Sequence, residues 1–252
     1  MTFLTKDLVL LAQNSPEYDG YVIFEVWSLD AKAVLGRCKL PLPADKYLPW
    51  FISHPASNHS GQSPTKHARL FVPDPRIEIL GIIFRSTPAE LGMEIQTVTV
   101  ALSIHLFTQK FASLTKKAIE ENVKDIPVFE WNDWGPPVTR WLPSTIRGNI
   151  GIRTAFGARM LAIFIEPLPE GDAGIPMVYT TLLDFNPRPI ARGSVDDDTN
   201  DYSLRVYDEE DEWAAGNISV TSGLPYRAWF SNRRCSYSSF FLDGNTIIGS
   251  WV

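Results

Sequence analysis

The sequence predicts an all-β fold, a β-propeller, a partial propeller or another meandering architecture of antiparallel sheets, with one short helix. β-Branched and aromatic runs recur along the 252 residues, and such runs favour strands. The chain contains 19 Pro and 16 Gly, which interrupt long helices and separate short elements. The same pattern, a strand followed by a short turn and a basic strand, is predicted for three segments: 21–40, 97–116 and 177–193. This weak repetition is typical of meandering β architectures.

The expected strands follow one another along the chain. The run Tyr21–Trp27 is β-branched and aromatic, and Val34–Leu40 comes next, ended by prolines. The run 76–84 carries apolar residues at both odd and even positions, which indicates a strand buried on both faces. Asp243-Gly244 is a typical hairpin turn between two late strands. The other expected strands cover 69–72, 97–107, 159–165, 177–185, 228–230, 239–242 and 246–251.

One helix is expected near 109–124. Phe111, Leu114, Ala118 and Val123 lie on one loosely helical face, and Pro127 follows. The whole chain, 1–252, is expected to form a single β domain. Two long polar loops interrupt it, at 53–66 and at 194–213, and loops of this length are usually functional or disordered.

The composition excludes several classes of protein. A chain with 44% hydrophobic and 21% charged residues has enough apolar side chains for a core, which excludes wholesale disorder. The longest apolar runs stay below 18 residues, so no transmembrane helix and no membrane partner are expected. Leu8–Ala12 is too short for a signal peptide. The chain is therefore expected to be cytoplasmic, and its two cysteines cannot form a disulfide framework.

The negative charge is concentrated in one segment. The formal net charge is −6, and the segment 194–213 alone holds nine acidic residues and one arginine. The rest of the chain is close to neutral, so a nucleic acid partner is not expected. Because blocks of like charge repel one another, the acidic segment is expected to be a solvated loop.

No metal and no cofactor are expected. Asp197-Asp198-Thr199-Asn200-Asp201 matches a diphosphate-metal motif, but it lies within the acidic loop rather than on a rigid helix. The spacing of His54, His59 and His67 fits no compact zinc site. His105 is expected on a strand. The sequence contains no P-loop, no dinucleotide-binding glycine motif and no nucleophile elbow.

The segment 130–141 is the most unusual part of the sequence. It holds Trp131, Trp134, Arg140 and Trp141 around a Gly-Pro-Pro break. Tryptophan and arginine dominate binding hot spots, so these four residues are the candidate binding site. The alternative is a structural plug in which the rings pack and Arg140 bonds to carbonyl groups. We expect Trp134 to belong to the plug, and Trp131 and Trp141 to be better placed to face a ligand.

The same segment resembles the C-terminal half of the large F-box protein family of mushroom-forming fungi. The resemblance covers about 125–252 and rests on five stretches: 131–136, 139–141, Leu183-Asp184-Phe185-Asn186-Pro187, Leu224-Pro225-Tyr226-Arg227, and 238–244 leading into Ile247-Ile248-Gly249. It implies a WD40-like propeller that holds a substrate for ubiquitination behind an F-box, and it carries over no catalytic residue. This sequence departs from the family because no Leu-Pro-rich F-box is present. The chain is therefore expected to be a fragment, a shortened relative, or a protein with another role.

Three functions remain open. The first is a non-enzymatic recognition module for a protein partner. The second is an enzyme on the same scaffold that acts on a small apolar ligand, for which the candidate catalytic residues are Asp133, Arg140, Tyr179, Asp184 and Tyr226. The third is a cytosolic carbohydrate-binding protein, for which the eight Trp are the argument. Open sheet edges also predict pairing with a second copy of the chain.

Overall fold

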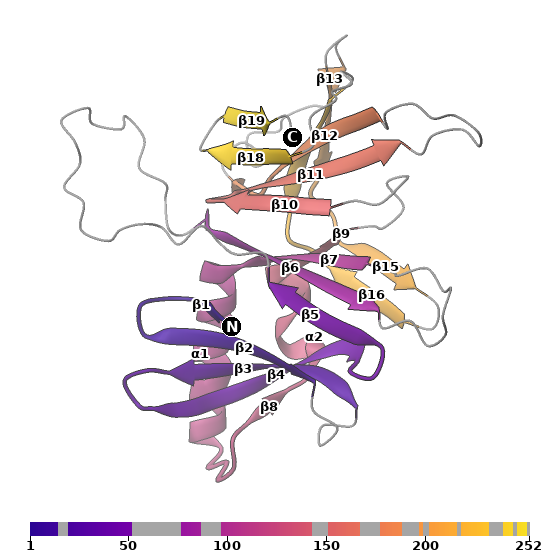
Figure 1. The fold of residues 1–252 in the computed structure, drawn as a ribbon. Helices are drawn as coiled ribbons and strands as arrows, with labels where there is room; N and C mark the ends of the chain where they lie inside the picture. Colours follow the sequence, from indigo (N-terminus) through magenta and orange to yellow (C-terminus); the bar gives the residue numbers. More distant parts are fainter. Residues whose placement is uncertain are drawn as a thin grey trace, which may run out of the picture. The chain divides into compact units, whose positions relative to one another are not determined.

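The computed structural model describes residues 1–14, 20–51, 77–86, 97–142, 151–166, 177–187, 197–198, 202–215, 218–231, 239–243 and 246–250. The chain forms two compact units (Figure 1). Unit 1 comprises Met1–Phe51, Ile82–Pro143 and Glu209–Leu224, and unit 2 comprises Ile52–Gly81, Ser144–Asp208 and Pro225–Val252. Strands predominate in both units, which confirms the all-β class. The propeller and the single domain over 1–252 stay predictions.

Unit 1 contains a five-stranded sheet. Its order is β1 (Thr2–Phe3), β2 (Leu8–Asn14), β3 (Tyr21–Ser28), β4 (Ala33–Pro43) and β8 (Val128–Phe129). The first four strands are antiparallel neighbours, and β8 joins β4 in parallel. Both outer strands are only two residues long, which shortens the edges that another strand needs for pairing. Pairing of a second copy through sheet edges stays a prediction.

A four-stranded sheet completes the framework of unit 1, to which all of its residues belong except the first three of β6. Its order is β5 (Tyr47–Phe51), β6 (Ile79–Ser86), β7 (Thr97–Ser103) and β9 (Thr139–Leu142). Every residue of β6 from Ile79 to Phe84 is buried, which confirms a strand covered on both faces. The ring of Phe84 stacks on Phe24 of β3 with 6.3 Å between centroids. The two sheets of unit 1 therefore share one core.

The helix α1 (Ile104–Glu120) begins five residues earlier than the sequence pattern suggested. Ser103 caps it, because its hydroxyl oxygen accepts a hydrogen bond from the backbone N–H of Leu106 at 3.4 Å. The strand predicted to run to 107 thus ends at Ser103, and His105 lies in a helix. The expected repeat fails here, since 97–116 is a strand followed by a helix. No helix in the described ranges is long and apolar enough to cross a membrane.

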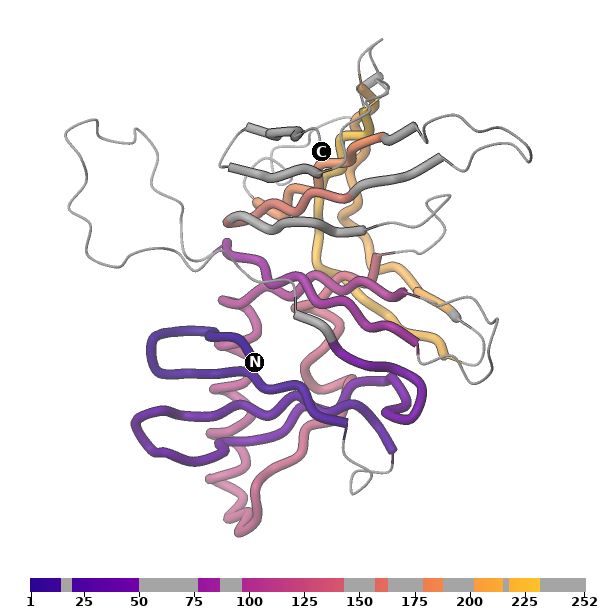
Figure 2. Tube along the Cα trace, in the orientation of Figure 1, coloured from indigo at the N-terminus to yellow at the C-terminus, as the bar shows by residue number. Residues whose placement is uncertain are grey.

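Unit 2 is built on a six-stranded sheet. Its order is β10 (Gly151–Phe156), β11 (Arg159–Glu166), β12 (Met177–Asp184), β17 (Tyr226–Ser231), β14 (Tyr202–Tyr207) and β13 (Asp197–Asp198). The strands β18 (Ser239–Asp243) and β19 (Thr246–Ser250) pair in antiparallel fashion, which confirms the hairpin predicted at Asp243-Gly244. In the trace of Figure 2, the strands β14 and β17 of this sheet are drawn in orange to yellow.

The acidic segment is structured where it is described, so the loop predicted over 194–213 is wrong for most of these residues. β14 lies between β17 and β13, and β15 (Asp211–Ala215) pairs with β16 (Ile218–Ser222) in unit 1. Trp213 is buried, and its ring lies 5.1 Å from that of Trp141. Partner strands and one buried ring thus order a run that local charge repulsion alone would leave extended. The loop predicted at 53–66 and the strand at 69–72 lie outside the described residues.

Candidate functional site

The Trp segment lies in the core of unit 1. It forms the short helix α2 (Trp131–Trp134), the 3₁₀ turn η2 (Pro136–Val138) and β9. Trp131, Trp134 and Trp141 are all buried, with exposed fractions of 9%, 1% and 1%. Trp131 packs edge-on against both other rings, at 4.9 Å from Trp134 and 5.6 Å from Trp141. The structure brings the three predicted binding rings together, but it buries them against one another in edge-to-face contacts.

Further aromatic rings, from β3, β6 and α1, contact this cluster. Trp134 contacts Phe24 of β3 and Phe107 of α1 at 6.1 and 5.5 Å, and Trp141 stacks on Phe84 at 6.4 Å. The indole N–H of Trp134 donates to the carbonyl of Lys39 at 3.3 Å. Such interlocked aromatic pairs mainly contribute packing energy. The geometry of this segment therefore agrees with the structural plug rather than with an open binding site.

Asp133 and Arg140 also have partners within the packing of unit 1. The backbone N–H of Glu130 donates to the Asp133 carboxylate at 3.1 Å, which closes the start of α2. Arg140 is 2% exposed. Its guanidinium donates to the carbonyl of Glu209 at 2.8 Å and lies 3.5 Å from the Asp211 carboxylate. Arg140 thus anchors the acidic run to the Trp segment, as the plug interpretation predicts.

The other candidate catalytic residues belong to unit 2. Asp184 is buried at the end of β12, and its carboxylate lies 3.2 Å from the Arg227 guanidinium and 3.6 Å from that of Arg159. Tyr226 is buried and stacks on Tyr207 at 4.5 Å. These contacts place Asp184 and Tyr226 in the internal packing of unit 2.

Tyr179 lies in the middle of β12 and is half-buried. In the strand register it stands opposite Phe164 of β11. The five candidate catalytic residues are therefore divided between the units, with two in unit 1 and three in unit 2.

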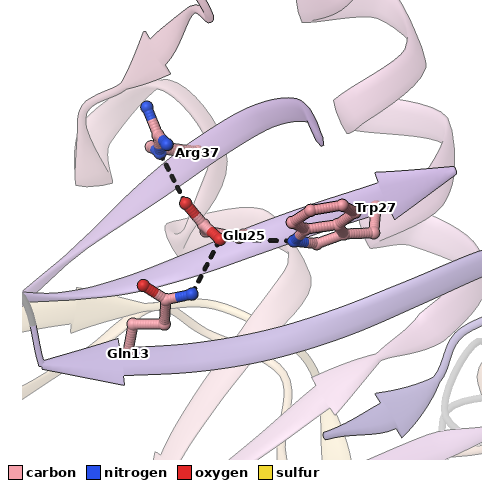
Figure 3. A network of polar contacts seen from close by, with 4 residues as sticks. All are labelled: Gln13, Glu25, Trp27 and Arg37. Atoms are coloured by element: carbon pink, nitrogen blue, oxygen red, sulfur yellow. Dashed lines mark hydrogen bonds and ion pairs between the residues drawn. The ribbon is translucent and has the colours of Figure 1, made fainter. Parts of the chain in front are cut away.

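A polar network lies on the other face of the five-stranded sheet (Figure 3). Side chains alternate along β3, so Phe24 points into the aromatic core and Glu25 points away from it. The Glu25 carboxylate accepts hydrogen bonds from Arg37 at 2.7 Å, Gln13 at 2.8 Å and the Trp27 indole at 3.2 Å. Glu25 is only 4% exposed, and this set of donors offsets the cost of its burial.

The same face continues along the two strands to Tyr21 and Lys39. The Lys39 ammonium lies 4.5 Å from the centre of the Tyr21 ring and 3.5 Å from the Glu130 carboxylate. A cation over an aromatic face gains about 0.5–1 kcal/mol at an exposed site. Tyr21 is thus held in a fixed orientation at the end of this polar face.

An open hollow of about 490 Å³ lies beyond Tyr21, within unit 1. Its residues come from the start of β3, the end of β4 and the start of β16: Gly20, Tyr21, Pro41, Pro43, Asp45, Ile218 and Ser219. The pairing register of β3 and β4 shifts here, because Ile23 opposes Lys39 but Tyr21 opposes Pro43. Two prolines cannot donate to the ladder, so they are accommodated in a bulge. The bulge and the β15–β16 hairpin together form the hollow.

Sequence reasoning missed this site, although one signal was present. Along β3 the residues Tyr21, Glu25 and Trp27 share one face with the buried Ile23, and along β4 Arg37 and Lys39 alternate with buried residues. Alternation of aromatic and charged side chains with a period of two indicates a face that is not core. The contribution of Ile218 and Ser219 has no local signal, because it depends on where a distant hairpin packs.

The metal-binding candidates have no counterpart in the described residues. In those ranges, no group of three or more His, Cys, Asp or Glu side chains is arranged to hold a metal ion. His54, His59, His67 and most of the Asp197–Asp201 motif lie outside them. Cys38 is a free thiol in the core, and burial raises its pKa far above the ordinary value.

Comparison with known proteins adds no relative. No protein-family model matches the chain, no curated protein matches it, and no solved structure matches it. The resemblance to fungal F-box proteins therefore stays a prediction that rests on the residues quoted above.

Proposed function

We propose that the chain is a non-enzymatic recognition module that binds a protein partner through the hollow at the end of the polar sheet face. The observation that carries this proposal is the lining of the hollow, which combines a half-buried ring with two prolines and Ile218. Exposed Asp45 and Ser219 complete the lining. A concave site with an apolar wall and a few polar groups is the usual form of a binding pocket.

The surroundings of the hollow support binding because they fix its shape in advance. Tyr21 lies under the Lys39 ammonium, and Glu25 ties three neighbouring side chains to the centre of the sheet. Side chains that are ordered before binding lose less conformational entropy when a partner arrives. The polar face therefore supplies a rigid platform for the hollow.

The proposal also fits the lineage that the sequence suggests. We propose a fungal, cytoplasmic protein of the F-box lineage, with a WD40-like propeller that presents a substrate-binding surface without the ligase adaptor. The enzyme alternative needs an aromatic cavity, and the rings that would wall it pack against one another in unit 1. The hollow, not the Trp segment, is therefore the surface to test.

A peptide-display selection tests the proposal. Random peptides are selected on the wild-type chain, and the enriched pool is then bound to Tyr21→Ser and Ile218→Asp variants. We expect each variant to retain less than about a tenth of the binding, as for loss of a central hot-spot side chain. Tyr202→Ser, which removes an exposed tyrosine from unit 2, is the matched control and should bind normally. Equal binding by all four proteins, or no enrichment on the wild type, would contradict the proposal.

A further inference from the structure

The chain leaves the sheet of unit 2 between two neighbouring strands and contributes a hairpin to unit 1. The strands β14 and β17 are hydrogen-bonded neighbours, yet the residues between them, Glu209–Leu224, belong to unit 1. This insert forms the β15–β16 hairpin, which supplies Ile218 and Ser219 to the hollow. We propose that the hairpin couples the two units, so that opening of the β14–β17 pair in unit 2 also loosens one wall of the hollow.

Unit 1 holds the hairpin through the Trp segment. Trp213 of β15 is buried, and its ring lies 5.1 Å from that of Trp141. The backbone N–H of Trp141 donates to the Ser222 hydroxyl at 3.1 Å, and the N–H of Leu224 donates to the carbonyl of Thr139 at 3.0 Å. A two-stranded hairpin alone is only marginally stable in water. These contacts therefore keep β15 and β16 paired.

Unit 2 holds both ends of the same insert. Tyr207 is the last residue of β14 and Tyr226 is the first of β17; the two are register partners, and their rings stack at 4.5 Å. Asp208 and Pro225 are the single residues that separate this pair from the insert. Because one residue spans at most about 3.6 Å of extended chain, the base of the hairpin cannot move far without parting the tyrosine pair.

The hollow depends on the hairpin for part of its lining. Ile218 and Ser219 come from β16, whereas the other lining residues lie between Gly20 and Asp45 in the sequence. A hairpin that opens locally takes this part of the wall with it. A peptide in the hollow should in turn oppose the opening, because coupling between two sites is reciprocal. This last consequence rests on the proposed function, whereas the coupling itself does not.

Amide hydrogen exchange on the full chain tests the coupling without a ligand. Trp213→Ala removes the ring that holds the hairpin to Trp141, and it should accelerate exchange in β14 and β17 at least about tenfold more than in β11 of the same sheet. Phe111→Ala is the matched control, because it removes a buried ring of unit 1 that contacts Phe107 and Phe129 instead. Equal effects of the two variants on β14 and β17, or equal acceleration in all strands of unit 2, would overturn the proposal.

The reverse experiment changes unit 2 and leaves the core of unit 1 intact, so it decides the question even if Trp213→Ala does not fold. Tyr207→Ser breaks the stack on Tyr226 at the hairpin end of β14, and it should accelerate exchange in β15 and β16 at least about tenfold. Tyr202→Ser changes the tyrosine at the other end of β14 and should leave this exchange unchanged. If the two variants behave alike, the hairpin does not couple the units.

The peptides from the display selection separate the coupling from the proposed function. At about 100 times its Kd, a selected peptide should slow exchange in β14 and β17 of the wild type at least about tenfold more than in β11. A peptide that requires Tyr21 but leaves β14 and β17 unchanged overturns the coupling and leaves the recognition module standing. Coupled exchange in the variants with no peptide selected supports the coupling and contradicts the recognition module alone.

Discussion

The two faces of the five-stranded sheet in unit 1 use aromatic residues in opposite ways. On one face Phe24 contacts Phe84 and Trp134 in a closed aromatic core. On the other face Trp27 and Tyr21 hold polar partners, the Glu25 carboxylate and the Lys39 ammonium. The sequence is richest in tryptophan where the structure is closed. Abundance of large aromatic residues therefore indicates the core here, whereas their alternation with charged residues indicates the candidate site.

Removal of a core ring should produce the largest effect. Trp134→Ala deletes a ring that contacts three elements of unit 1, and it should lower the free energy of unfolding by about 3–5 kcal/mol. Urea denaturation followed by circular dichroism measures the loss. A Trp134→Ala variant with unchanged stability and lost peptide binding would contradict the plug interpretation.

Breaking the polar network should cost less, because Arg37 remains partly hydrated. Glu25→Leu removes the acceptor of three hydrogen bonds, and it should lower the free energy of unfolding by about 2–4 kcal/mol. The double variant Glu25→Leu/Arg37→Leu should recover at least about 1 kcal/mol, because it also removes the cation. Glu120→Gln, in the exposed pair with Lys116, is the control and should change stability by less than about 0.5 kcal/mol. If the double variant is less stable than Glu25→Leu, the loss in the single variant does not come from leaving the Arg37 cation without its partner.

A single added methyl group tests how closed the core is. The Trp131 ring occupies the space that a Cβ atom on Gly135 would need. Gly135→Ala should therefore lower the free energy of unfolding by about 1–3 kcal/mol through overpacking. Gly20→Ala is the comparison, because Gly20 has a φ of +74° but open space around its Cβ position. It should cost about 1 kcal/mol from backbone strain alone. If Gly135→Ala costs nothing, the contacts of the Trp131 ring are looser than described.

Burial on the core face also predicts a dependence of stability on pH. Desolvation raises the pKa of Cys38 above its ordinary value near 9. Above pH 9 an unfolded thiol ionises while the buried thiol stays protonated, so the native state binds more protons than the unfolded state. Stability from this group is complete below pH 9 and falls as the pH rises, by at most about 1.4 kcal/mol per pH unit.

Urea midpoints between pH 8 and 10 measure this slope, and Cys38→Ala should flatten it. Burial also raises the pKa of Tyr47 above 10, so Tyr47 adds a loss of the same sign at higher pH. An identical slope in the wild type and in Cys38→Ala would show that Cys38 does not contribute.

The sequence predicted the parts of the fold that depend on local pattern. β3, β4, β6, β11 and β12 follow β-branched runs, and each lies within a few residues of its predicted position. The start of α1 was missed because Ile104 to Phe107 also alternates like a strand, and the decisive signal is the single cap at Ser103. The acidic strands were missed because Trp213 and Asp211 depend on Trp141 and Arg140, which are distant in sequence. The hollow was missed for the same reason, since Ile218 reaches it only after folding.

The smallest effect on stability should come from Tyr21, and this makes it the sharpest test of the comparison. Tyr21 and Phe24 lie on the same strand but on opposite faces, and both are aromatic. Phe24→Ala should cost about 3–5 kcal/mol, whereas Tyr21→Ala removes a half-buried ring and one cation–π contact and should cost no more than about 1 kcal/mol. For binding of the peptides selected on the wild type the order should reverse, with each variant assayed under conditions in which circular dichroism shows it to be folded. Tyr21→Ala should abolish binding of the selected peptides, and folded Phe24→Ala should retain it. If both variants lose stability equally, or if Tyr21→Ala still binds the selected peptides, the two faces do not divide packing from recognition.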